Sequence, residues 1–169
     1  EFYNEHIGFE LDGAKLGIAC ADEPSGALTV NVGLISMDAE AVIIDVNVRY
    51  PVTKTDDEIY ALLLPGLDAR DLGLIKKDHK APIYFSPDTP LITKLMEVYR
   101  KNTGDTEHGP IVVGGGTYAR AVPNCVAFGP RFPDEADLMH QKDEYVTVES
   151  LLRSAHIYAD AIIALASRE

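Results

Sequence analysis

The sequence predicts a protein of the α+β or mixed α/β class, and three observations support this. Two segments in the first half alternate apolar and polar residues, as strands with one buried face do. Other segments repeat apolar residues at helical spacing, most clearly near the end of the chain. Short apolar runs bounded by glycine and proline lie between them and read as further strands. The 169 residues fit one domain or two small ones.

The first half of the chain predicts two strands, a helix and a strand, preceded by a short strand over 16–21. Alternation over 28–34 predicts a half-buried strand, and alternation over 42–50 predicts the clearest strand of the chain. We expect these two strands to form an antiparallel hairpin with one apolar and one polar face. The polar face of the second strand carries Ile43, Asp45, Asn47 and Arg49.

A helix is expected after this hairpin, followed by one more strand. Thr55 or Asp56 can cap the helix, and acidic residues in its first turn favour its amino end. The pair Pro65-Gly66 is expected to end it. Residues 72–77 read as the strand that follows.

The second half predicts two helices with two short strands between them. Asp88 or Thr89 caps the first helix, Pro90 lies in its first turn, and Asn102 to Gly104 ends it. The runs 111–113 and 125–128 are expected to be short buried strands. The last helix follows Thr147 and has the strongest pattern. Its apolar residues recur at helical spacing: Val148, Leu151, Leu152, Ala155, Ala159, Ile162, Ile163 and Ala166.

Charge and composition exclude several classes of function. Fifteen basic and 27 acidic residues give a net charge of −12 and a pI near 4.7. A nucleic-acid binder needs a basic face, and an anionic membrane surface attracts basic segments, so we expect neither partner. No apolar run approaches the ~18 residues of a membrane-spanning helix. Cys20 and Cys125 are expected to be two buried thiols rather than a disulfide, which favours a reducing, cytoplasmic location.

Arg49 is the first candidate for binding chemistry. It lies on the polar face of its predicted strand beside Asn47 and Asp45. A guanidinium in that position is suited to two parallel hydrogen bonds with a carboxylate. The alternative is an ion pair with Asp45 or another acidic side chain of this acidic chain.

The triple glycine 114–116 and five histidines are the other candidates. Glycines between a strand and Thr117 would let backbone amides approach an anion or a carbonyl group, and the alternative is a tight bend. No histidine belongs to a recognised metal-ligand motif. His140 lies in an acidic loop and is either a metal ligand or solvated. His156 is expected to pack beside the apolar stripe of the last helix, whereas His79 and His108 are expected to be solvated.

Several motifs occur together in an order that is specific to one group of enzymes. They are VNVRYP at 46–51, SPDTP at 86–90, PIVVGGGTYAR at 110–120, CVAFG at 125–129, Met139-His140, Asp143 to Tyr145 and IYADA at 157–161. With these motifs the chain resembles the C-terminal part of the di-zinc dipeptidases called dipeptidase V or Xaa-His dipeptidase (carnosinase-like). Those enzymes belong with the aminoacylase and carboxypeptidase G group of zinc peptidases.

The resemblance implies a fold in two parts. Residues 1–81 would be the last portion of a lid domain, an antiparallel lid-type sheet with helices on one face. Residues 82–169 would be the C-terminal portion of an α/β zinc-peptidase catalytic domain. The polar face of the predicted hairpin fits the open side of such a lid.

The resemblance also implies roles for individual residues. His140 matches the C-terminal zinc ligand, and Arg49 matches the lid arginine that holds the C-terminal carboxylate of a dipeptide substrate. Gly115, Gly116 and Thr117 match the loop that lines the substrate site. The family's other zinc ligands, bridging aspartate, general base and lid histidine match nothing in this chain. We therefore expect a piece of an enzyme with two zinc ions that is inactive by itself.

A second interpretation is a non-catalytic α+β module for ligand binding or dimerisation. Sheets of the lid type can pair edge to edge, and unpaired strands would leave edges and apolar faces open to a homo-oligomer. A His-x-Asp motif and a Glu-Glu pair in the preceding coding sequence would favour the peptidase. An immediate start codon would favour the module.

Overall fold

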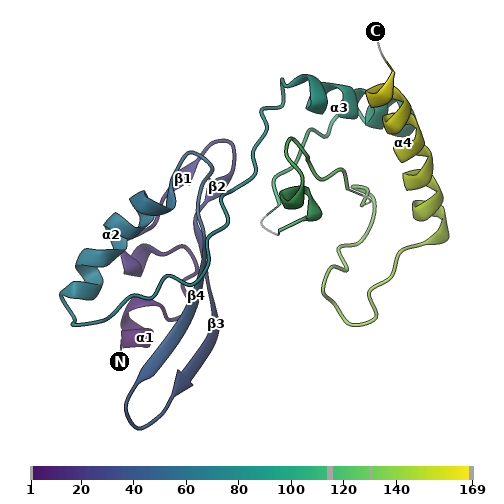
Figure 1. Cartoon of the computed structure of the whole chain (residues 1–169). Coiled ribbons are helices and arrows are strands. Elements are labelled where there is room, and N and C mark those ends of the chain that lie inside the picture. The colour runs from purple at the N-terminus through teal and green to yellow at the C-terminus, as the bar shows by residue number, and fades with distance from the viewer. Residues whose placement is uncertain (1, 114–115, 130, 168–169) are drawn as a thin grey trace. The chain divides into compact units, whose positions relative to one another are not determined.

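The computed structural model describes residues 2–113, 116–129 and 131–167 (Figure 1). The chain divides into two compact units, Glu1–Tyr84 and Phe85–Glu169, called unit 1 and unit 2. Both contain helices, and unit 1 contains two small antiparallel sheets. The mixed α/β class predicted from the sequence is thereby confirmed. None of the helices in the described ranges is long and apolar enough to cross a bilayer.

The main sheet of unit 1 is an antiparallel pair of strands, β3 (Thr29–Met37) and β4 (Val42–Arg49). Its register sets Val30 opposite Val48 and Thr29 opposite Arg49, with an irregularity between Val32 and Leu34. This is the predicted hairpin, and β3 extends three residues beyond the predicted end. The carboxylate of Asp38 accepts the backbone N–H groups of Glu40 and Ala41 and so closes the turn.

The amino-terminal part of unit 1 corrects one prediction. The helix α1 (Phe2–His6) and the 3₁₀ helix η1 (Ala14–Leu16) precede the short pair β1 (Ala21–Asp22) and β2 (Gly26–Ala27). The expected strand over 16–21 is therefore wrong. Its central residue Ile18 is fully buried, so the apolar run fills the core of unit 1 without joining a ladder. Gly13 is required beside it, because its φ is +75° and a Cβ would lie 2.7 Å from Ile18.

The helix α2 (Asp56–Asp68) packs on one face of the main sheet at the end away from the turn, and the turn end of the hairpin extends beyond it (Figure 1). Thr55 and Glu58 form a capping box, because each side chain accepts the other's backbone N–H. Ile59 and Leu63 pack with Val30 and Val48, and these residues form the core of unit 1 with Ile18 and Leu28. The helix continues beyond Pro65, so the predicted end at Pro65-Gly66 is wrong. A proline this close to the end of a helix removes a single backbone donor, and the Ala69 N–H still reaches the Pro65 carbonyl at 3.2 Å.

The predicted strand over 72–77 is also wrong. This segment is irregular and exposed, and side chains rather than a backbone ladder hold it to the rest of unit 1. Lys76 forms a short ion pair with Asp56, and Lys77 Nζ lies 2.7 Å from Asp45 Oδ2.

Unit 2 is built around two packed helices, α3 (Pro90–Thr103) and α4 (Val148–Ala166), as the sequence predicts. Thr147 caps α4 by accepting the Ser150 N–H at 3.0 Å, and Gly104 ends α3 with a φ of 72°. The core contains two residues from each helix and Phe132 from the segment between them: Leu95, Val98, Phe132, Ile157 and Ala161. Among the described residues between the helices, the one regular element is the 3₁₀ helix η2 (Tyr118–Ala121).

The two strands predicted between these helices do not form. Residues 111–113 and 125–128 have no ladder partner among the described residues of the chain. Val126 and Phe128 instead pack beside the core of unit 2, while Ile111, Val112 and Val113 are exposed. A strand exists only where a second backbone accepts and donates its hydrogen bonds, so apolar character alone did not produce one here.

The face of α4 that packs on α3 is not its apolar stripe. The buried residues are Ser150, Ser154, Ile157 and Ala161. All eight predicted stripe residues are exposed, and they lie on the opposite side of the helix, which we call the outer face of α4. Small residues on the inner face let α3 approach closely, and this contact, not the apolar period, selects the buried face.

Candidate substrate-binding site

Arg49 ends β4 on the side of the main sheet that faces away from α2. Its neighbours on that face are Asn47 on the same strand and Thr29 and Asn31 on β3, because Thr29 pairs with Arg49 and Asn31 with Asn47. All four side chains are exposed. The opposite face holds Val30 and Val48 against the core. The alternation in the sequence therefore produces a polar platform with a single cation at one end.

The guanidinium of Arg49 has no hydrogen bond or ion pair with any residue that the structure describes. The alternative interpretation paired it with Asp45, but the Asp45 carboxylate lies 2.7 Å from Lys77 Nζ instead. An exposed arginine without an acidic partner keeps all its donors available for an anion. A planar carboxylate matches the paired donors of the guanidinium.

A network around Asp22 fixes the chain immediately after Arg49. The Asp22 carboxylate accepts the Ser25 N–H and hydroxyl at 2.7 Å each, and the Thr53 N–H at 3.0 Å. The Ser25 hydroxyl in turn accepts the Val52 N–H at 2.9 Å. Desolvation raises the pKa of Asp22, but the hydrogen bonds from Ser25 and Thr53 outweigh it and lower the pKa to about 2. This carboxylate therefore holds the end of β4 in place while ionised.

A second cluster lies beside Arg49 on the core side of the strand end. The Tyr50 hydroxyl and His79 Nε2 are 2.6 Å apart, and the two rings stack. His79 Nδ1 lies 3.7 Å from Asp56 Oδ2 at the start of α2. The hydrogen bond from Lys76 lowers the pKa of Asp56. His79 is exposed, as expected, but it also joins the irregular segment after α2 to the end of β4.

The glycine loop lies in unit 2 and is described in part. Gly114 and Gly115 lie outside the described residues. At Gly116 an added Cβ would meet Arg120 Nε at 3.5 Å, an ordinary contact, so the packing of unit 2 does not require glycine there. Thr117 precedes η2, is exposed, and makes no capping hydrogen bond with its hydroxyl. The Thr117 carbonyl accepts the Arg120 N–H at 3.2 Å, whereas the Thr117 hydroxyl has no hydrogen bond with described residues.

His140 lies in a tightly bonded loop of unit 2. Its φ is +60° and that of Asp143 is +59°, values that residues other than glycine seldom adopt. The Glu144 carboxylate accepts the His140 N–H at 3.2 Å, and Asp137 accepts the Met139 N–H at 3.3 Å. The imidazole is exposed and makes no hydrogen bond with described residues. Local bonds therefore hold the backbone in a strained conformation that presents an unused imidazole.

The described residues do not fit a complete zinc site. No group of three or more histidine, cysteine, aspartate or glutamate side chains within the described ranges could hold a metal ion. Protein zinc sites use three or four protein ligands, and His140 supplies one. A zinc ion on His140 would need its other ligands from outside the described part of this chain.

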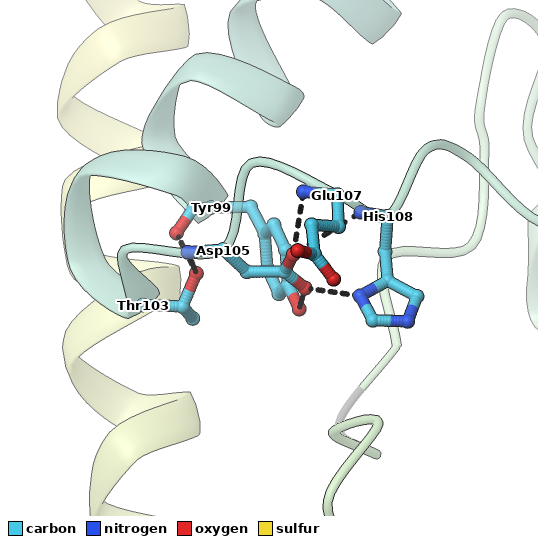
Figure 2. Close-up of polar contacts among 5 residues, drawn as sticks. All are labelled: Tyr99, Thr103, Asp105, Glu107 and His108. Atoms are coloured by element: carbon cyan, nitrogen blue, oxygen red, sulfur yellow. Dashed lines mark hydrogen bonds and ion pairs between the residues drawn. The ribbon is translucent and has the colours of Figure 1, made fainter.

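Sequence reasoning missed the strongest polar network of unit 2, which follows the end of α3 (Figure 2). The Asp105 carboxylate accepts the Tyr99 hydroxyl at 2.8 Å and the backbone N–H groups of Glu107 and His108, and it lies 2.8 Å from His108 Nδ1. These bonds, that from Tyr99 first, lower the pKa of Asp105 to about 2. His108 is therefore not merely solvated as expected. An aspartate directly after the glycine that ends a helix was the available signal.

Other expectations about individual side chains have mixed outcomes. His156 is exposed on α4, so the prediction that it packs is wrong. Cys20 and Cys125 are free thiols, as expected, and both are half-buried. Arg49 belongs to unit 1, whereas Gly116, Thr117 and His140 belong to unit 2.

Comparison with known proteins identifies the family of this chain. The chain belongs to Peptidase family M20/M25/M40, whose model matches residues 6–164. It is 43% identical over 155 residues to "Putative dipeptidase YtjP" of Bacillus subtilis, covering 91% of this chain and 33% of that protein. It is 35% identical over 166 residues to "Putative dipeptidase SH1171" of Staphylococcus haemolyticus, covering 98% of this chain and 35% of that protein. The chain thus spans about a third of the length of these relatives.

Proposed function

We propose that this chain is the C-terminal part of a zinc-dependent dipeptidase, that it binds the substrate, and that it is inactive by itself. In this proposal residues 1–81 are the last portion of the lid and residues 82–169 the C-terminal portion of the catalytic domain. Membership of a peptidase family and similarity to proteins named as dipeptidases support it. The free thiols Cys20 and Cys125 are compatible with a location in the reducing cytoplasm.

The observation that carries the proposal is the unpaired Arg49 at the end of the polar platform. A dipeptide carries a carboxylate at its C-terminus, and Arg49 would bind it through two charge-assisted hydrogen bonds. Gly116 and Thr117, with Gly115, would line the substrate through backbone and hydroxyl groups. The described contacts leave the Arg49 guanidinium and the Thr117 hydroxyl without a hydrogen-bond partner in their own units.

His140 would contribute one imidazole nitrogen to the metal site. The two zinc ions expected from the family resemblance would take their other ligands from outside the described part of this chain, because no group of three or more potential ligands lies within the described ranges. The local bonds from Asp137 and Glu144 would fix the loop before the metal binds.

A chimera tests the proposal. The segment of YtjP that matches this chain is replaced by residues 1–169, and dipeptide hydrolysis is measured with and without chelation and zinc, with intact YtjP as the positive control. We expect zinc-dependent hydrolysis by the chimera and none by the 169-residue chain. A folded chimera without activity, or dipeptide hydrolysis by the chain alone, would contradict the proposal.

Substitution of Arg49 in that chimera tests the central role. Arg49→Ala should raise KM by about 30- to 160-fold, equivalent to about 2–3 kcal/mol of charged hydrogen bonding. The same substitution should leave KM nearly unchanged for a dipeptide amide, which has no C-terminal carboxylate. Arg100→Ala, which removes an exposed arginine from α3, is the matched control. An equal effect on both substrates would show that Arg49 does not bind the carboxylate.

A further inference from the structure

The strand β4 ends at Arg49, and backbone pairing does not hold the chain beyond that residue. Arg49 is opposite Thr29 at the end of the main sheet. Pro51 follows two residues later and has no N–H with which to extend the ladder. The last pair of a ladder frays unless other contacts hold it. The position of the Arg49 guanidinium therefore depends on how the residues after the strand are fixed.

Side chains fix this strand end in two ways. The network around Asp22 holds the backbone N–H groups of Val52 and Thr53, at 2.9 and 3.0 Å. Tyr50, the residue directly after the arginine, is held through its side chain instead. Its hydroxyl lies 2.6 Å from His79 Nε2, and the two rings stack with centroids 6.1 Å apart. Along the chain, this second contact is the one nearer to the guanidinium.

His79 is itself held on the other side of its ring. Its Nδ1 lies 3.7 Å from Asp56 Oδ2 at the start of α2, and Asp56 forms a short ion pair with Lys76. A line of four side chains thus joins the end of β4 to the start of α2. A tyrosine hydroxyl and an imidazole nitrogen can each donate a hydrogen bond, and either can accept when the ring is neutral. The bond between Tyr50 and His79 can therefore form whether the ring is neutral or protonated.

The place of this contact separates it from the core of unit 1. Tyr50 packs beside that core, whereas His79 is exposed. Substitution of an exposed residue changes the free energy of unfolding little, so the bond can be removed without unfolding the unit. Neither partner is a carboxylate, so neither competes with a substrate for the Arg49 guanidinium.

We propose that His79 is a positioning residue: by holding Tyr50 it fixes the backbone of Arg49, and so the place from which the guanidinium binds the substrate carboxylate. This inference rests on the proposed function, in which Arg49 binds that carboxylate. His79 and Tyr50 themselves contact no substrate and act only through Arg49. Loss of their bond should therefore weaken binding of a dipeptide but not of a dipeptide amide.

Amide hydrogen exchange in the 169-residue chain tests the local part of the inference. Tyr50→Phe removes one hydroxyl, and Tyr60→Phe makes the same change at a tyrosine of α2 whose hydroxyl has no hydrogen bond with described residues. We expect exchange at Val52 and Thr53 to become about 3- to 10-fold faster in the first variant and to stay unchanged in the control. Exchange at Glu40, in the turn of the hairpin, should not change in either. Unchanged exchange at Val52 and Thr53 would overturn the inference.

The kinetic test uses two substitutions of His79 in the YtjP chimera. A glutamine amide reaches about as far as histidine Nε2 and can still bond the Tyr50 hydroxyl, whereas an asparagine amide is one methylene shorter. His79→Asn should raise KM for the dipeptide about 3- to 10-fold, the effect of one neutral hydrogen bond, with kcat nearly unchanged. His79→Gln should restore most of this loss, and neither variant should change KM for the dipeptide amide. Tyr50→Phe with His79→Asn should cost no more than either alone, because both remove the same bond.

The outcomes separate this inference from the proposed function. If Arg49→Ala raises KM for the dipeptide alone but His79→Asn does not, the carboxylate role of Arg49 stands and His79 does not position it. Equal rises of KM for dipeptide and amide, or additive effects of the two substitutions, would also overturn the inference, because His79 would then act on the fold rather than through Arg49. A chimera without hydrolysis would reject the proposed function, and exchange at Val52 and Thr53 would then decide whether His79 holds the strand end.

Discussion

Units 1 and 2 have nearly equal lengths but differ in where their strand-like segments find partners. In unit 1 a four-residue turn brings β4 back onto β3, and α2 follows at once to cover the pair. In unit 2 the segments 111–113 and 125–128 have no neighbouring strand in sequence, and they remain irregular. Pairing that is local in sequence completes itself, whereas pairing that needs a distant strand depends on that strand being present.

The helices show the same difference. The buried residue of α2, Ile59, packs on the sheet formed just before it. In contrast, α4 buries small residues against α3 and leaves its apolar stripe exposed. The end of the main sheet that carries Arg49 is therefore packed within the chain, although the end near the turn leaves Met37 and Val42 exposed, whereas α4 leaves its whole apolar stripe exposed.

The sharpest test of this comparison uses one substitution on two sides of α4. Ile157 is 5% exposed and Ile162 is 67% exposed. Ile157→Ala should lower the free energy of unfolding of the 169-residue chain by about 2–5 kcal/mol, because it leaves a cavity beside α3. Ile162→Ala should change it by less than about 0.5 kcal/mol. Urea unfolding followed by circular dichroism measures both, and similar losses would mean that the outer face is already packed in the chain.

Prediction from the sequence located the exposed and buried faces correctly for the hairpin of unit 1 but not for the helix α4 of unit 2. Alternation placed Arg49 on the polar face, because a hairpin fixes both register and faces by local geometry. Helical spacing located α4 but not its buried side, because eight apolar residues outweighed Ser150, Ser154 and Ala161 in the pattern. No described segment of the chain covers this stripe.

Single side chains were harder to predict than elements. His79 and His108 lie in polar loops, and nothing in the spacing shows that Tyr50 and Asp105 reach them. The sequence alone also did not decide whether Arg49 binds an anion or forms an ion pair with Asp45. The position of Lys77 removed Asp45 from consideration, and that contact depends on an irregular segment that was predicted as a strand.

Acid should destabilise both units, with Asp22 in unit 1 and Asp105 in unit 2 among the aspartates responsible. The pKa values of Asp22 and Asp105 are lowered to about 2 from 3.8, so each carboxylate binds protons less readily when folded than when unfolded. Each therefore contributes stability that is complete above about pH 4 and is lost as the pH falls towards 2. Asp22→Asn and Asp105→Asn should flatten this part of the curve of unfolding midpoint against pH. Urea midpoints from pH 6 to pH 2 measure it, with Asp57→Asn, an exposed aspartate of α2, as the control. A variant with the wild-type slope would remove its aspartate from this role.

The smallest effect distinguishes the amino ends of two helices. The Thr55 hydroxyl accepts the Glu58 N–H at 3.3 Å within the capping box of unit 1, whereas the Thr89 hydroxyl donates to the Ser86 carbonyl and caps nothing in unit 2. Thr55→Ala should therefore cost about 1 kcal/mol of unfolding free energy, and Thr89→Ala less. Thr55→Ser keeps the acceptor and should restore most of the loss. Equal costs at both positions would mean that Pro90 and the Ser86 bond fix the start of α3 as firmly as the reciprocal cap fixes α2. The difference between the two units would then be confined to the outer face of α4.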